Sequence, residues 1–479
     1  MPSVLQFDRQ QVRTIRLAAQ GLANVPGQPV ATVVARSGFV RTLGGCDAYL
    51  AVRARQRTLR RAEVDGAVER SELQVVPAAR GCMYLVPRAD VPLCLRFADQ
   101  MSRARNERDQ ERAGIQKGEV EQLAELAFAV LKKQGPLTTD ALRKALPEGA
   151  VRSLGERGKK VGVSSPLPGA LRWLEFAGRI ERKPEGGRVD TERYLWRAAQ
   201  KSPFVGSKLP DEPARLHALL LERFVAHAGL ATLADFCAWS GLSQRDARAA
   251  RAHSSVEPAA IAGSDEEAMT TPAVAELLRM APAVAAATAF LPFEDNLVHL
   301  YSGPAHLVAD EHLSLALPSW NAADKPTTLG AARYLSLRGL IADGQLSGFW
   351  EYDPDARVAV PRCFRKPSKA AQVQIEELSA AVSTFLSDDI GHGHSFSLDS
   401  DDELRKRLQQ LAAIGGDKRA AAGKVVARSA KGRAVRRPAA KPAAASKRGK
   451  AAAPAKPGQT ANRTVKLPRP IAARSRSRK

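Results

Sequence analysis

The sequence predicts an α+β fold in which tandem winged-helix (helix-turn-helix) units are followed by a C-terminal β-rich domain and a disordered basic tail. Three observations support this class. Apolar residues recur at helical spacing, hairpin signals follow groups of helices, and large apolar residues almost disappear after residue 416. With 479 residues, of which 44% are hydrophobic, the chain is long enough for several packed domains.

The first unit is expected over residues 1–110. Its predicted helices cover 11–21, 29–37, 47–57 and 60–72. Short strands at 73–76 and 82–86 then surround a turn at Arg80-Gly81. Helices that precede a two-stranded hairpin are typical of a winged helix, so this segment is interpreted as one.

Two more units are expected, over residues 115–200 and 210–285. In the second, predicted helices at 119–134, 139–146 and 165–177 precede a hairpin that turns at 185–187, and an exposed loop is expected at 149–163. In the third, Ser243 is the N-cap candidate for a helix at 244–252, which follows another at 233–239.

The β-rich domain is expected over residues 286–390. Its candidate strands are 296–301, 340–341, 346–352 and 358–360. Asp343-Gly344 between two of them is a strong hairpin signal. A helix that carries Ile375, Leu378, Val382 and Phe385 on one face is expected to cover the sheet.

The basic tail, expected over residues 416–479, holds most of the excess charge. Residues 417–479 contain 20 Lys or Arg and one Asp, a net charge of +19 out of +23 for the whole chain, which leaves +4 for residues 1–416. Few apolar residues remain to form a core, so disorder is expected. Arg436 and Arg437 are candidate phosphate contacts, while a solubilising role or binding to RNA or acidic protein is the alternative.

Several classes are not supported by the sequence. No run of about 18 apolar residues predicts a membrane span, and the N-terminus lacks the apolar stretch of a secretory signal. The five cysteines form no CxxC pair, which argues against zinc fingers and a disulfide framework. No cofactor is expected, and the predicted location is the cytoplasm, in association with the nucleoid.

Four stretches carry a resemblance to a known family. They are Leu50-Ala51-Val52-Arg53-Ala54-Arg55, Arg80-Gly81-Cys82-Met83-Tyr84-Leu85-Val86, Asp235-Phe236-Cys237-Ala238-Trp239-Ser240-Gly241-Leu242, and Leu291-Pro292-Phe293-Glu294-Asp295-Asn296 paired with the segment 343–350. In this order they resemble the AlkZ-like winged-helix DNA glycosylases. The resemblance implies three tandem winged helices and a β-rich domain around a channel for DNA.

One motif of that family is not matched. The resemblance implies a Gln-x-Gln or Gln-x-Asp pair, thought to position the attacking water, upstream of the helix that carries Arg55. The corresponding positions here lie near Arg41 and Leu43. Neither side chain has an oxygen that could orient water or accept its proton. No catalytic residue is therefore carried over from the family.

Carboxylates near this segment are therefore the candidates for the general base. Asp47 is the candidate general base, with the N-cap of the following helix as the alternative role. Glu294, Asp295 and His299 form a second acid-and-imidazole set, which could equally cap a strand entry. His392 and His394 lack further ligands nearby, so no metal site is expected.

The folded part also contains candidate DNA contacts. They are Arg41, Arg80, Arg152, Arg157, Lys159, Lys160, Arg172 and Arg179. Structural ion pairs or solvated charge runs are the alternative roles for these residues.

The sequence favours a winged-helix protein that binds double-stranded DNA largely independently of sequence, helped by its tail. The alternatives are a repair glycosylase that flips out alkylated or crosslinked bases, and a protein-interaction scaffold tethered to DNA by the tail. Oligomeric state is left open.

Truncation after residue 416 should weaken the salt dependence of DNA binding. Each phosphate contact contributes about 0.9 to the slope of log K against log[salt], so loss of many tail contacts should flatten that slope by several units. Fluorescence anisotropy titrations at salt concentrations from about 50 to about 300 mM measure the slope. An unchanged slope would show that the tail does not contact phosphates.

Overall fold

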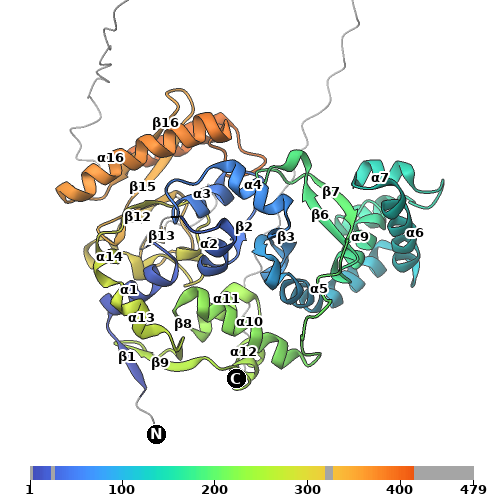
Figure 1. Cartoon of the computed structure of the whole chain (residues 1–479), viewed down its shortest axis with the longest axis horizontal. Coiled ribbons are helices and arrows are strands. Elements are labelled where there is room, and N and C mark those ends of the chain that lie inside the picture. The colour runs from blue at the N-terminus through green and yellow to red at the C-terminus, as the bar shows by residue number, and fades with distance from the viewer. Residues whose placement is uncertain (1–3, 23–26, 319–326, 415–479) are drawn as a thin grey trace, which may run out of the picture. The chain divides into compact units, whose positions relative to one another are not determined.

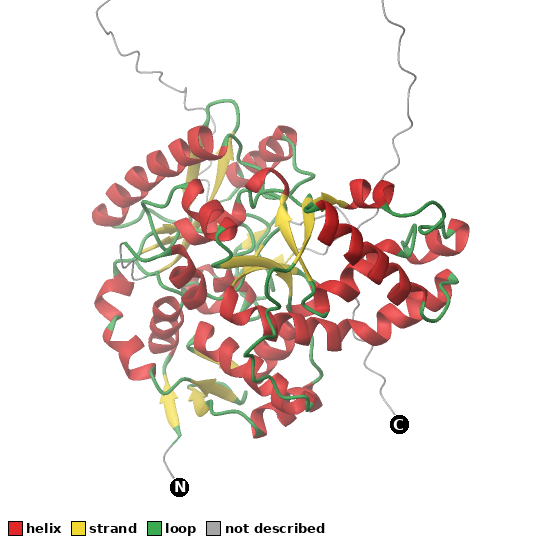
Figure 2. Cartoon of the chain, turned by 45° about the vertical axis from the view of Figure 1, so that its right-hand side comes forward, coloured by secondary structure: helices red, strands yellow, loops and turns green. Residues whose placement is uncertain are grey.

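The computed structural model describes residues 4–22, 27–318 and 327–414 (Figure 1). It is a mixed α+β structure, in which the strands form several small sheets among the helices (Figure 2). The predicted basic tail, with Arg436 and Arg437, lies outside the described residues. Within the described ranges, no helix combines the length and the apolar character needed to cross a bilayer.

One order of elements recurs three times along the chain: helix, strand, two helices, two strands, with one extra helix, α8 (Gly155–Val161), inserted in the second copy. The first copy contains α2 (Val30–Ser37), β2 (Val40–Arg41), α3 (Asp47–Arg53), α4 (Arg61–Glu69), β3 (Leu73–Pro77) and β4 (Met83–Pro87). The second contains α6 (Glu119–Gln134), β5 (Leu137–Thr138), α7 (Thr139–Ala145), α9 (Leu167–Phe176), β6 (Ile180–Pro184) and β7 (Tyr194–Ala198). The third contains α10 (Pro213–Ala228), β8 (Leu230–Thr232), α11 (Leu233–Ser240), α12 (Gln244–Ala252), β9 (Glu257–Ile261) and β10 (Ala268–Thr270).

The strands of each copy pair in the same way. The last strand lies between the other two, which gives the sheet orders β2-β4-β3, β5-β7-β6 and β8-β10-β9. The third sheet gains β1 (Leu5–Phe7), which pairs with β9 in parallel. The copies are joined or flanked by α1 (Arg9–Ala19), α5 (Val91–Ala113), α13 (Val274–Arg279) and α14 (Ala281–Ala285).

Side-chain caps set several of these helix starts. Thr138 accepts a hydrogen bond from the backbone N–H of Ala141, and Ser243 accepts one from that of Asp246. Each cap satisfies a donor that the first turn of a helix leaves unpaired. The Ser243 cap was predicted from the sequence and is confirmed.

The fourth part of the described chain is an antiparallel sheet with the order β11-β14-β15-β16. Its strands are β11 (Ala289–Phe290), β14 (Arg338–Ala342), β15 (Gln345–Asp353) and β16 (Val358–Cys363), and the short pair β12 (Ala316–Leu317) and β13 (Thr327–Thr328) lies apart from it. The predicted Asp343-Gly344 hairpin is confirmed, with both residues at positive φ. The helices α16 (Lys369–Thr384) and α17 (Asp401–Ala412) pack against β16 and β15 respectively.

Two sequence-based predictions are wrong. The segment 296–301 was expected to be a strand, but its first part forms the helix α15 (Asn296–His299), because the Asp295 side chain caps the backbone N–H of Leu297. The expected loop at 149–163 contains the helix α8 (Gly155–Val161), which ends at Gly162 in the left-handed conformation.

Two of the hydrophobic cores are shared between the repeated copies and the C-terminal part. One buried cluster joins Leu50 and Val64 of the first copy to Trp350 and Ile375 of the C-terminal sheet and its covering helix. Another joins Phe97 of α5 to the third copy and to the C-terminal part. The second copy keeps a smaller core of its own. The first copy and the C-terminal sheet are therefore stabilised together.

A buried arginine on β14 links these parts through polar contacts. The guanidinium of Arg338 is fully buried and donates to Glu351 Oε1 (2.7 Å) and to Asp47 Oδ1 (3.0 Å). It also donates to the carbonyl of Gly393 (2.8 Å) and to Ser395 Oγ (2.7 Å). One side chain thus holds the sheet, the start of α3 and the segment before α17 in one arrangement.

Replacement of Arg338 by methionine should lower the free energy of unfolding by about 3–5 kcal/mol, because two buried carboxylates would lose their shared cation. Urea denaturation measures the loss. The matched control is Arg405→Met on α17, where the exposed arginine pairs with Asp355 and Asp402 and a cost of about 1 kcal/mol or less is expected. Equal losses in the two variants would contradict this role for Arg338.

Candidate active site

A polar recess lies where the first copy meets the loop before α15. Its walls are formed by Ser37, Val40, Arg41, Leu43, Asp47, Ala51, Arg55, Pro292, Glu294, Asp295 and Asn296. Arg41 and Leu43, the two positions at which the sequence resemblance expects glutamines, are both on this wall.

A buried ion pair forms one side of the recess. Arg55 lies just after the end of α3, and its guanidinium donates to both carboxylate oxygens of Asp295, at 2.7 and 2.8 Å. Its remaining N–H groups donate to the side chain and carbonyl of Gln20 and to the carbonyl of Ala51. Asp295 also caps α15 by accepting from the backbone N–H of Leu297, so both of its oxygens take part in structural contacts.

Asp47 is also fully engaged. Its Oδ2 accepts the backbone N–H of Phe293 (2.8 Å), while Oδ1 accepts from Arg338 and from the hydroxyl of Ser395 (3.2 Å). Burial raises the pKa of Asp47, and the charge of Arg338 opposes that rise. The helix that starts here has no side-chain cap, so the capping role weighed for Asp47 is wrong. Its role as a general base stays a prediction.

The third carboxylate on the wall, that of Glu294, has a different environment. Glu294 pairs with Arg41, and the two side chains are 22% and 17% exposed. Burial raises the pKa of Glu294, an effect that Arg41 opposes and the nearby charge of Asp47 adds to. Arg41 also approaches the sulfur of Cys82 (3.6 Å). This pair therefore faces the recess with part of its surface open to solvent.

His299, the third member of the predicted acid-and-imidazole set, is the last residue of α15 and does not line the recess. Burial, together with the charges of Arg41 and Arg80, lowers the pKa of His299 to about 3. Its imidazole is neutral at physiological pH and is a poor source of a proton.

Arg80 lies at the turn between β3 and β4, and its side chain is exposed. Its φ of 53° lies in the left-handed region, where a residue with a Cβ is strained. A Cβ placed on Gly241 would lie 3.1 Å from the Cγ of Arg80. The hairpin turn of the first copy therefore packs on the turn between α11 and α12 of the third.

The adjoining helix α12 carries cations that sequence reasoning did not single out. Arg245 and Arg248 are exposed and three residues apart, so they lie on one face of the helix. The signal was present in the sequence as the arginine spacing of 244–252, directly after a capped helix-turn-helix connection.

The predicted contacts of the second copy lie on its surface and several have acidic partners. Arg152 pairs with Glu119, Lys159 with Glu156 and Arg179 with Glu125. The remaining members are exposed, and one of them donates to an amide oxygen, that of Asn106; these members are Arg157, Lys160 and Arg172. None of these residues lines the recess, and their DNA contacts stay predictions.

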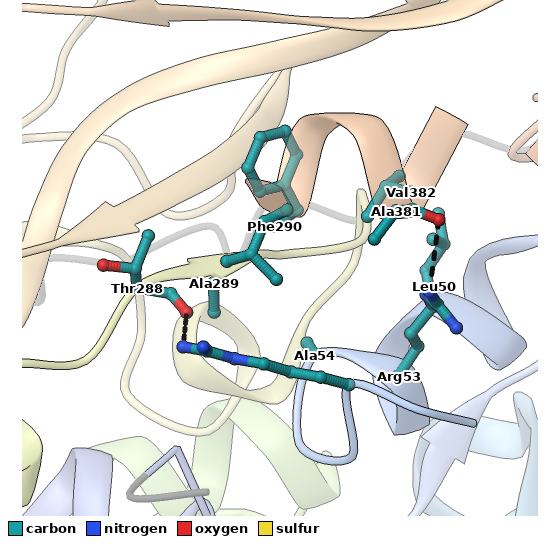
Figure 3. Close-up of a pocket in the computed structure, with 10 residues that line it drawn as sticks. Leu50, Arg53, Ala54, Thr288, Ala289, Phe290, Ala381 and Val382 are labelled. Carbon is teal, nitrogen blue, oxygen red and sulfur yellow. Dashed lines mark hydrogen bonds between the residues drawn. The ribbon is translucent and has the colours of Figure 1, made fainter. Parts of the chain in front are cut away.

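Two other regions lie outside this recess. A second recess between α3, β11 and α16 is lined mainly by apolar side chains (Figure 3). Its arginines are already bound, because Arg57 donates to the carbonyl of Thr288 and Arg53 to that of Ala381.

His392 and His394 occupy the second region, in the segment before α17. They contact Asp190 and Asp401 separately, and no cluster in the described part of the chain has three or more metal-ligating groups.

Comparisons with known proteins identify the family of the chain. A family model described as "DNA glycosylase AlkZ-like" matches residues 44–386. A structural comparison finds the DNA glycosylase AlkZ of Streptomyces sahachiroi, with a TM-score of 0.58 and 20% identity over 79% of this chain and 97% of that one. No curated protein sequence matches. Because the family model covers well over half of the sequence, the chain belongs to the AlkZ-like DNA glycosylase family.

Proposed function

We propose that this protein is a DNA repair glycosylase built from three winged-helix units and a β-rich domain. The single observation that carries the proposal is the recess beside Arg41, whose wall holds an accessible carboxylate in a chain of the AlkZ-like family. The order of elements and the strand pairing of the three copies support the winged-helix assignment.

The proposed chemistry follows from the family and from the carboxylate on the wall of the recess. An enzyme that acts on a base takes it out of the duplex and binds the nucleotide in a pocket, at a cost of a few kcal/mol. The attacked bond joins the base to the sugar carbon C1′. An alkylated purine with a positive ring leaves as a neutral base, so no strong acid is needed to protonate it. The neutral state of His299 is consistent with that requirement.

The arginines outside the recess supply the grip on the duplex. We propose that Arg80, Arg245 and Arg248 contact phosphates, which carry the sequence-independent part of DNA affinity. The surface cations of the second copy and the tail would extend this contact. In this proposal the protein acts in the cytoplasm on nucleoid DNA, and Asp47 holds the recess together rather than acting as the base.

A second candidate function is duplex binding without excision. It is favoured by one observation, the presence of Arg41 and Leu43 where the family resemblance implies glutamines.

Release of a modified base separates the two functions. The protein should liberate N3-methyladenine or N7-methylguanine from alkylated duplex DNA and leave alkali-labile abasic sites, which chromatography and gel electrophoresis detect. Unmodified duplex serves as the control and should stay intact. Tight binding of both duplexes with no release would replace the glycosylase by the second candidate.

The double variant Arg245→Ala/Arg248→Ala should weaken binding to any duplex sequence and lower the salt slope by about 2, since about one phosphate contact is lost per arginine. Anisotropy titrations at several salt concentrations measure both effects. The control is Arg215→Ala/Arg405→Ala, which removes two arginines outside α12 that pair with carboxylates, as Arg245 does with Asp246. The same loss in both double variants would show that α12 is not a DNA-contacting helix.

A further inference from the structure

We infer that Glu294 is the catalytic carboxylate that orients and deprotonates the attacking water. It lies on the same wall of the recess as Arg41 and Leu43, the positions at which the family's glutamine pair is absent. This inference rests on the proposed glycosylase function and assigns a residue within the same recess.

The first step is elimination among the three carboxylates of the wall. Asp295 is bound on both oxygens by Arg55, and Asp47 is bound on both oxygens by Arg338, Ser395 and the Phe293 backbone. Glu294 has one ion-pair partner, Arg41, through Oε2. Among the described residues, no hydrogen bond is made to its Oε1. Glu294 is thus the wall carboxylate with an oxygen that accepts no hydrogen bond from a described residue, which leaves this oxygen for water.

The second step is the rigidity of its position. The residues on either side of Glu294 are each held by a distant part of the chain. The Phe293 N–H donates to Asp47, and the Asp295 carboxylate pairs with Arg55. A catalytic group held in this way needs little reorganisation before reaction. The same contacts explain why Asp47 and Asp295 are buried without being available for chemistry.

The third step is the state of the group. Arg41 stabilises the ionised form, while burial raises the pKa of Glu294 and makes it a better proton acceptor than an exposed glutamate. Arg41 acts as a positioning residue that holds the carboxylate toward the recess. The apolar side chain of Leu43 on the same wall cannot compete for the water.

The reaction balances without a cofactor. The water oxygen forms a bond to C1′ as the bond from C1′ to the base nitrogen breaks, and the electron pair of that bond neutralises the positive ring of the alkylated base. The second proton of the attacking water passes to Glu294 and then to solvent.

The test compares Glu294→Gln with the wild type in single-turnover excision of N3-methyladenine from duplex DNA. The rate should fall by about 100-fold or more, as for loss of a general base, while the duplex Kd changes less than about threefold. The wild-type rate should rise with pH as Glu294 ionises, and the glutamine variant should lose that rise. The control is Glu311→Gln, an exposed glutamate paired with Arg365, which should behave as wild type.

A second pair of variants separates chemistry from folding. Glu294→Asp and Glu294→Asn have equal size, so only the aspartate should recover part of the rate. Wild-type rates in Glu294→Gln, or equal rates in the aspartate and asparagine variants, would overturn the role of Glu294 and leave the glycosylase intact. No excision by the wild type would overturn both.

Discussion

The guanidinium of Arg338 and the carboxylate of Asp47 form the contact on which the arrangement of the recess depends. Burial of either charge alone would be very unfavourable, so the strand β14 and the start of α3 must meet. Because Asp47 also accepts the Phe293 N–H, the contact fixes the loop that carries Glu294. Glu351 extends the network to Arg407 of α17, which ties the last described helix to the same centre.

The network divides the work among acids that look alike in the sequence. Asp47 and Asp295 each pair with a buried arginine. Glu294 pairs with Arg41 through one oxygen, and its other oxygen accepts no hydrogen bond from a described residue. The cost of holding a partly buried carboxylate near the recess is offset by Arg41, and by the ion pairs on both sides that fix the backbone. The two buried aspartates thereby fix the position of Glu294.

Local signals in the sequence predicted much of the fold, and nonlocal contacts were beyond them. The helices at Glu119–Gln134 and Gln244–Ala252 were predicted because their stripes and caps lie within a few residues. The helix α5 was missed because apolar residues dominate its start and charges its remainder, which leaves no continuous stripe. In the recess, the wall positions Arg41 and Leu43 were reached through the family resemblance. The Arg55–Asp295 and Arg338–Asp47 pairs join residues hundreds of positions apart, so no local pattern could separate the anchored acids from Glu294.

A crystal structure of the protein bound to duplex DNA that contains a cationic abasic-site analogue would show whether Glu294 holds the attacking water. We expect the flipped sugar in the recess beside Arg41, with a Glu294 oxygen about 3 Å from a water aligned with the C1′ position, and α12 along the phosphate backbone. A duplex bound on another face, with the Arg41–Glu294 pair closing an empty recess, would contradict it.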